Sequence, residues 1–182
     1  MHQDDGALIA RVLKRNDQRA YATLVNRYQS KLRNSMRQLT GWDEALADDL
    51  AQETFIQAYV HLNSFKGEAQ FFTWLYKIAY RQFAQYYRSR KITVPLEDGC
   101  EDEDQGQSLS STDLQQDIAR ALATFPPEQA MALHLHLHRG YTHQEVSDIL
   151  EAPLGTIKSH IVRGREKLKV LLSEWQNREN AL

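Results

Sequence analysis

Basic and hydrogen-bonding side chains recur at three- and four-residue steps close to the C-terminus. On a helix, that spacing lines up one polar face with further cations at its flanks: Thr156, Ser159, His160, Arg163 and Lys167, flanked by Lys158 and Arg165. Arginine and lysine bind guanine edges or phosphates, and serine, threonine and histidine can hydrogen-bond to either. The spacing fits a helix that reads the major groove of DNA, and it fits equally well an ordinary helical hairpin with a solvated basic face.

The preceding segment supplies the elements that would position this face. Thr142 and Glu145 form a capping box, which predicts the start of a short helix, and residues 151–154 form the turn after it. The second helix is expected to bury Ile157, Ile161, Leu168 and Leu171, with Gly164 on the same stripe, where helices can approach closely. These parts predict a helix-turn-helix over residues 142–172.

Acidic and amide side chains form a second polar strip in the first half of the chain. On one expected helix they fall four residues apart, in two pairs: Asp48 with Gln52, and Asp49 with Glu53. Taken by itself, such a strip indicates a solvated face.

The helix expected over residues 71–90 combines cations with aromatic rings. Most of its rings fall on one apolar stripe and are predicted to be buried, whereas two tyrosines fall off that stripe. Cations can follow the phosphates of a single nucleic-acid strand, and free rings can stack on its bases. The candidate single-strand contacts are Lys77, Tyr80, Arg81, Tyr87 and Arg88, with Lys66 in the preceding loop.

No set of residues suited to catalysis or metal binding stands out in the sequence. It contains no glycine-rich phosphate loop and no nucleophile motif, and Cys100 is the single cysteine. His134 and His138 lie four residues apart and could share a metal, but no nearby ligands complete a set. We therefore expect no enzyme activity, cofactor, metal or small-molecule substrate.

Composition and charge indicate the fold class and the domain organisation. Among 182 residues only 8 are glycine and 4 are proline, which favours an all-α fold, and no apolar run is long enough to cross a bilayer. Residues 1–91 hold 14 Lys/Arg and 9 Asp/Glu, residues 92–117 hold 8 Asp/Glu and no Lys/Arg, and residues 118–182 hold 8 and 7. We predict a cytoplasmic protein without direct membrane insertion, built from two small helical domains at 1–91 and 113–182. An acidic flexible linker, 92–112, is expected to join them.

Two sets of motifs resemble one known family. The C-terminal strings are Gly-Tyr-Thr-His-Gln-Glu-Val from Gly140, Ala-Pro-Leu-Gly-Thr-Ile-Lys-Ser-His from Ala152 and Arg-Gly-Arg-Glu-Lys-Leu from Arg163, after Phe-Pro-Pro at 125–127. These resemble region four of bacterial sigma factors of the extracytoplasmic-function (ECF) group. The strings Asp-Asp-Leu-Ala-Gln-Glu-Thr-Phe from Asp48 and Phe-Thr-Trp-Leu-Tyr-Lys-Ile-Ala from Phe72 resemble region two of the same group.

The resemblance implies a promoter-specificity subunit of RNA polymerase that directs transcription initiation. It implies that the helix-turn-helix reads the minus-thirty-five element, that the helix over 71–90 and the loop before it bind the minus-ten element, and that the acidic strip docks on core RNA polymerase. It also implies promoter DNA and an anti-sigma factor as partners. Many members carry Asn and Asp where this chain has Arg81 and Gln85, so the minus-ten sequence is left open. The alternative is a freestanding helix-turn-helix regulator whose N-terminal bundle senses a ligand or dimerises.

Overall fold

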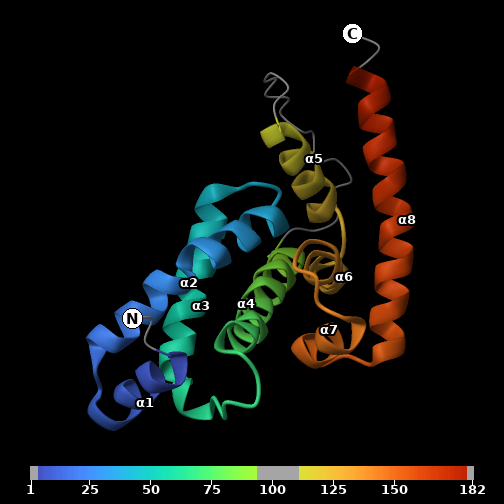
Figure 1. Ribbon diagram of the computed structural model, residues 1–182. Coiled ribbons are helices and arrows are strands. Elements are labelled where there is room, and N and C mark those ends of the chain that lie inside the picture. Colours follow the sequence, from blue (N-terminus) through green and yellow to red (C-terminus); the bar gives the residue numbers. More distant parts are fainter. Residues whose placement is uncertain (1–3, 94–110, 180–182) are drawn as a thin grey trace.

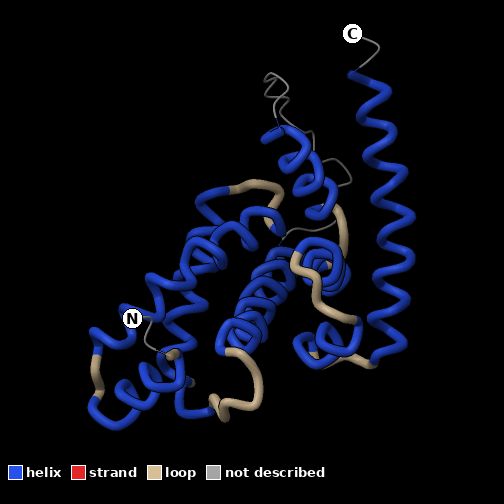
Figure 2. The backbone as a smooth tube through the Cα atoms, viewed as in Figure 1, coloured by secondary structure: helices blue, strands red, loops and turns tan. Residues whose placement is uncertain are grey.

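The computed structural model describes residues 4–93 and 111–179, and within these residues it contains helices and no strand (Figures 1 and 2). The N-terminal elements are α1 (Asp5–Arg15), α2 (Gln18–Leu39), α3 (Glu44–Val60), the 3-10 turn η1 (Leu62–Ser64) and α4 (Phe71–Thr93). The C-terminal elements are α5 (Ser111–Ala123), α6 (Pro127–Leu133), the π-helical turn η2 (His134–His138), α7 (His143–Leu150) and α8 (Leu154–Glu179). The all-α prediction is confirmed.

Side-chain caps fix where several helices begin. The Asp17 carboxylate accepts hydrogen bonds from two backbone amides at the start of α2, and Asp43 does the same for one amide of α3. At α7 the capping box predicted from the sequence is present: Glu145 N donates to Thr142 Oγ1 at 3.2 Å, and Thr142 N donates to Glu145 Oε2 at 2.8 Å. Because these caps act locally, the sequence could predict these helix starts.

One helix of the C-terminal half changes its winding. The helix that begins at Pro127 is α-helical only as far as Leu133, and residues 134–138 continue as the π-helical turn η2. A π turn closes hydrogen bonds over five residues and is widest of the helical forms, so it shifts the side chains that follow it. The Leu-His alternation of this segment does not produce a strand.

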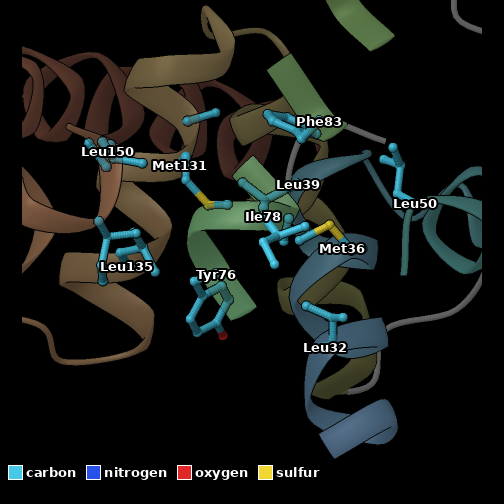
Figure 3. Close-up of a cluster of buried hydrophobic side chains, with 14 of the residues drawn as sticks. Leu32, Met36, Leu39, Leu50, Tyr76, Ile78, Phe83, Met131, Leu135 and Leu150 are labelled. Atoms are coloured by element: carbon cyan, nitrogen blue, oxygen red, sulfur yellow. The ribbon is translucent and has the colours of Figure 1, made fainter. Parts of the chain in front are cut away.

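The N-terminal and C-terminal halves share one hydrophobic core. In Figure 3, Met36 and Leu39 of α2 and Ile78 of α4 gather beside Met131 of α6. Met36, Leu39 and Met131 are fully buried. At a second point of contact, a Cβ added to Gly41, in the turn after α2, would lie 3.2 Å from Ala123 Cβ of α5. The two halves are therefore packed against each other, and not only joined through the chain.

The acidic linker predicted for 92–112 lies largely outside the described residues, and the helices α4 and α5 each extend two residues into it. A smaller core lies at the other end of the molecule, where Leu8, Ile9 and Val12 of α1 pack with Leu24 and Phe71. This core holds α1 against α2 and against the start of α4.

Helix α8 approaches α6 closely at a glycine. A Cβ added to Gly164 would lie 2.6 Å from Leu133 Cδ1, which is closer than real Cβ contacts. Ile157 and Ile161 of α8 are buried, whereas Leu168 and Leu171 are half-buried against the same core. The predicted buried stripe of α8 is present and is tightest at its centre.

Candidate nucleic-acid interface

The predicted DNA-reading face lies on the outer side of α8. Five of its seven residues are exposed on the outer face of the helix: Thr156, Lys158, Ser159, Arg163 and Arg165. Helix α7 and the turn after it brace the first turns of α8. This arrangement is the one that a major-groove helix requires, because the reading side chains are free while the opposite stripe is anchored.

Two members of the predicted face lie at its edge and contact protein. His160 is half-buried, with Nε2 3.9 Å from Glu128 Oε2, and its backbone carbonyl accepts a hydrogen bond from Gln129 Nε2 at 3.0 Å. The Lys167 ammonium lies 4.9 Å from the centre of the Phe125 ring, a cation-π contact. The freely exposed face is therefore narrower than the spacing alone indicates.

A polar cleft of about 520 Å³ lies between the end of α3, the loop before α4, and α4 itself. It brings together three of the cations predicted to bind a single strand, Lys66, Lys77 and Arg81, beside the indole of Trp74. The remaining lining residues are Gln57, His61, Ser64, Ile78, Gln82 and Glu151. Cations, amides and one aromatic ring are the groups that single-strand sites use for phosphates and bases.

The other predicted single-strand residues do not line this cleft. Tyr87 is half-buried, and its ring packs edge-on against Phe83 at 4.9 Å. Tyr80 is also half-buried, and burial raises the pKa of its hydroxyl. Arg88 is exposed further along α4.

Sequence reasoning missed Trp74 and Glu151 as lining residues of the cleft. Trp74 lies within the aromatic motif of α4, and its ring packs against those of Phe65 and Phe71 at centroid distances of 5.5 and 5.6 Å. Glu151 comes from the helix-turn-helix: its Oε1 and Oε2 lie 3.1 and 3.0 Å from Arg81 Nη2. Local sequence carries no signal for a contact between residues 70 positions apart.

The predicted acidic strip lies on α3, and its members differ in their surroundings. Asp49 and Gln52 are exposed, Asp48 Oδ1 lies 3.2 Å from Arg33 Nε, and Glu53 Oε1 accepts a hydrogen bond from Gln57 Nε2 at 2.7 Å. The strip is therefore accessible at its centre and tied to neighbouring side chains at its sides.

An apolar groove of about 480 Å³ continues from Gln52 between α2 and α3. Its floor includes Val25 and Phe55, and two exposed apolar side chains edge it: Ile56 is 47% exposed and Val60 is 61% exposed. Gln52, Ile56 and Val60 are four residues apart, so they stand in one row on the outer face of α3. That row is the signal in the sequence for the groove.

Two histidines of η2, His134 and His138, stack on each other, and the third, His136, stacks on His143 of α7. The described residues contain no group of three or more His, Cys, Asp or Glu placed to hold an ion. His134 is buried, and burial, with His138 and Arg139 nearby, lowers the pKa of its imidazole to about 3.

Among the described residues, no helix is long and apolar enough to span a membrane.

Comparison with known proteins first defines the class. Residues 24–92 match the family model of Sigma-70 region 2, and residues 115–168 match that of Sigma-70, region 4. The same two segments carry the polar cleft with the acidic strip and the helix-turn-helix, respectively, so the fold and the motifs agree on a sigma-70 protein.

Full-length relatives then give the family. The chain is 30% identical over 179 residues to the ECF RNA polymerase sigma-E factor of Haemophilus influenzae, covering 91% of this chain and 93% of the relative. It is 32% identical over 178 residues to that of Escherichia coli strain K12, covering 90% and 92%. The chain therefore belongs to the ECF family of sigma factors, and it is a sigma subunit that directs transcription initiation. The interpretation as a freestanding regulator is not supported.

Solved structures share the fold. The sigma factor RpoE of Bartonella quintana, solved with the anti-sigma factor NepR, aligns with a TM-score of 0.65 at 27% identity over 84% of this chain and 96% of RpoE. CnrH, solved with the cytosolic domain of CnrY, aligns with a TM-score of 0.68 at 24% identity over 93% and 97%.

Proposed function

We propose that this sigma subunit reads a promoter at two separate surfaces and docks on core RNA polymerase at a third. The upstream surface is the exposed face of α8, where Thr156, Ser159 and Arg163 would reach base edges of the minus-thirty-five element. Lys158 and Arg165 at its flanks would contact phosphates, and His160 and Lys167 would limit the face at the edge that meets α6.

The downstream surface is the polar cleft, which would hold one strand of the opened minus-ten element. The observation that carries this assignment is the meeting of Lys66, Lys77 and Arg81 from two segments around one concave site beside Trp74. The cations would follow the phosphate backbone, and the indole would stack on an unpaired base. Tyr80, Tyr87 and Arg88 extend along α4 beyond the cleft and would guide the strand that leaves it.

The polymerase surface is the strip of Asp48, Asp49, Gln52 and Glu53 on α3, together with the apolar groove that continues from it. An acidic strip complements a basic partner and speeds its approach, while an adjacent apolar groove supplies the area that is removed from water. The exposure of Asp49, Gln52, Ile56 and Val60 on one face supports a shared docking surface.

The remaining partners and the compartment follow from the family. The structural relative RpoE was solved with an anti-sigma factor, and we infer that this chain also has an inhibitory partner of that kind. The chain acts without a catalytic site of its own and works in the cytoplasm, where RNA polymerase transcribes.

Run-off transcription with core polymerase over a promoter library tests these assignments. We expect activity only when both elements are present. Lys77→Ala should weaken promoters according to their minus-ten element, and Arg163→Ala according to their minus-thirty-five element. A promoter profile that either variant changes uniformly, without regard to element, would overturn the corresponding surface.

A further inference from the structure

Glu151 stands at the lip of the polar cleft and belongs to the other half of the chain. It is the first residue of the turn between α7 and α8, with a left-handed φ of 54°, a conformation that glycine and asparagine adopt more readily than glutamate. Its carboxylate lines the cleft and meets Arg81 Nη2 with both oxygens, at 3.0 and 3.1 Å. A negative side chain of the helix-turn-helix therefore lies in the site that the N-terminal half forms from cations.

A carboxylate on a guanidinium makes the same charge-assisted contact that a phosphate makes. Arg81 is one of the three cations in the cleft, so Glu151 occupies a position where a strand phosphate would bind. Lys66 and Lys77 line the same cleft. The cleft is thus partly neutralised by the protein itself.

Packing between the halves holds Glu151 in this place. Near the start of α7, Tyr141 Oη lies 3.3 Å from Thr73 Oγ1 of α4, and the Tyr141 ring meets Tyr76 edge-on at 6.0 Å. The Arg139 guanidinium lies 5.6 Å from the centre of the Phe72 ring. These contacts and the shared core fix α7 against α4, so the ion pair need not supply the binding energy that places Glu151.

The two DNA surfaces differ in this arrangement. The outer face of α8 is open, with Thr156, Ser159 and Arg163 exposed. The cleft of the N-terminal half, in contrast, is covered at one end by Glu151 of the C-terminal half. Any masking by Glu151 is therefore confined to the single strand.

We propose that, in the free subunit, Glu151 masks the single-strand cleft as an internal phosphate mimic, and that a strand binds only by displacing it from Arg81. This inference rests on the proposed assignment of the cleft to the minus-ten strand. The side chains of Arg81 and Glu151 are 64% and 56% exposed, so solvent screens the pair. Its removal should therefore tighten strand binding by at most about fivefold, the ratio that corresponds to about 1 kcal/mol.

The test is equilibrium binding of a short fluorescein-labelled single-stranded DNA to the full chain, followed by fluorescence anisotropy at low salt. Glu151→Gln keeps the size of the side chain and removes its charge. Asp148→Asn is the matched control, because it removes one exposed charge from α7 at a residue that does not line the cleft. We expect Glu151→Gln to bind about three- to fivefold more tightly than wild type, and Asp148→Asn to bind as wild type.

A second background separates masking from a general charge effect. In Arg81→Ala, the phosphate site that Glu151 covers is absent, so adding Glu151→Gln should produce no further gain. An equal gain in both backgrounds, or an equal gain from Asp148→Asn, would overturn the masking.

Lys77→Ala tests the cleft separately. If Lys77→Ala binds the single strand more weakly and Glu151→Gln binds it as wild type does, the cleft assignment stands and the masking alone is overturned. Binding that no variant changes, or that the full chain lacks at the lowest salt, would overturn both.

Discussion

The rings of His134 and His138 stack in the π-helical turn of the C-terminal half, with their centroids 5.2 Å apart. His134 is buried among residues of the shared core, and burial lowers its pKa from 6.5 to about 3. His138 and Arg139 contribute to this shift after burial, because a second positive charge beside either of them is unfavourable. The folded protein therefore keeps His134 neutral at neutral pH.

We predict that the free energy of unfolding falls as the pH is lowered below 6.5, towards the folded-state pKa of about 3. The unfolded chain binds the proton in this window and the folded chain does not, so His134 contributes a slope of about 1.4 kcal/mol per pH unit. Urea unfolding from neutral pH down to about pH 5 measures it.

The variants for this experiment are His134→Leu and, as a control, His61→Gln at an exposed histidine. His134→Leu should reduce the slope of the free energy of unfolding against pH by roughly the contribution of one proton. His61→Gln should leave the contribution of His134 in place. A wild-type stability that stays constant through the acid range would contradict the prediction.

A second prediction concerns the close approach of α8 and α6. Gly-to-Ala changes inside a helix usually stabilise it by about 0.5–1 kcal/mol. At Gly164 the new Cβ would lie 2.6 to 3.0 Å from three atoms of Leu133, and overpacking a core costs about 1–3 kcal/mol. We expect Gly164→Ala to destabilise the protein by about 1–2 kcal/mol in urea unfolding.

Gly155 provides the matched control on the same helix. A Cβ at Gly155 meets nothing within 4 Å, so Gly155→Ala should be neutral or stabilising. Equal effects of the two substitutions would show that α8 shifts away from Leu133 at little cost.

Local signals explain how much of this fold the sequence predicts. Local signals mark both ends of α2, Gln18–Leu39, because an aspartate cap precedes the helix and Thr40-Gly41 follows it. The winding of residues 134–138 could not be predicted in this way, since no cap or period distinguishes a π turn from an α-helix. There the packing of the two halves overrides the local pattern.

The residues of the candidate site also differ in whether local sequence predicts them. Charge and helical period predict Lys77 and Arg81, Lys66 is a cation of the preceding loop, and the fold gathers all three around one cleft. Glu151 reaches that cleft only because α7 packs on α4, a relationship between distant segments. Tyr80 and Tyr87 fall off the apolar stripe of their helix, yet both are half-buried, because neighbouring rings extend the core around α4.

The polymerase-docking surface gives the third prediction. Asp49→Lys together with Glu53→Lys should abolish co-elution with core polymerase in gel filtration, because two of the three acidic side chains of the strip become basic. Asp49 is exposed and Glu53 is half-buried with Gln57 as its partner, so the far-ultraviolet circular dichroism should stay that of the wild type. Asp148→Lys with Glu166→Lys changes the net charge equally at exposed sites of the C-terminal half. Unimpaired assembly of the strip variant would refute the docking assignment.

The groove beside the strip makes a separate fourth prediction. Ile56→Ser and Val60→Ser shorten side chains that are 47% and 61% exposed, so little stability should be lost. If polymerase covers the groove, each substitution should weaken association, with a faster dissociation rate and little change in its salt dependence. Leu13→Ser is the control, since Leu13 is 49% exposed on α1 and does not line the groove. Equal effects at Leu13 and Val60 would argue that the groove stays open in the complex.

The last prediction separates two basic residues that are one turn apart on α8. Arg163 is exposed, whereas the Lys167 ammonium lies 4.9 Å from the centre of the Phe125 ring. Arg163→Ala should therefore reduce transcription from promoters that depend on the minus-thirty-five element by about tenfold, the loss of one good base contact of roughly 1.4 kcal/mol. Lys167→Ala should reduce transcription from these promoters less. It should instead lower the free energy of unfolding by about 0.5–1 kcal/mol, because the cation-π contact is lost. Run-off transcription and urea unfolding of both variants measure the two effects, and the reverse pattern would place the reading face on the α6 side of α8.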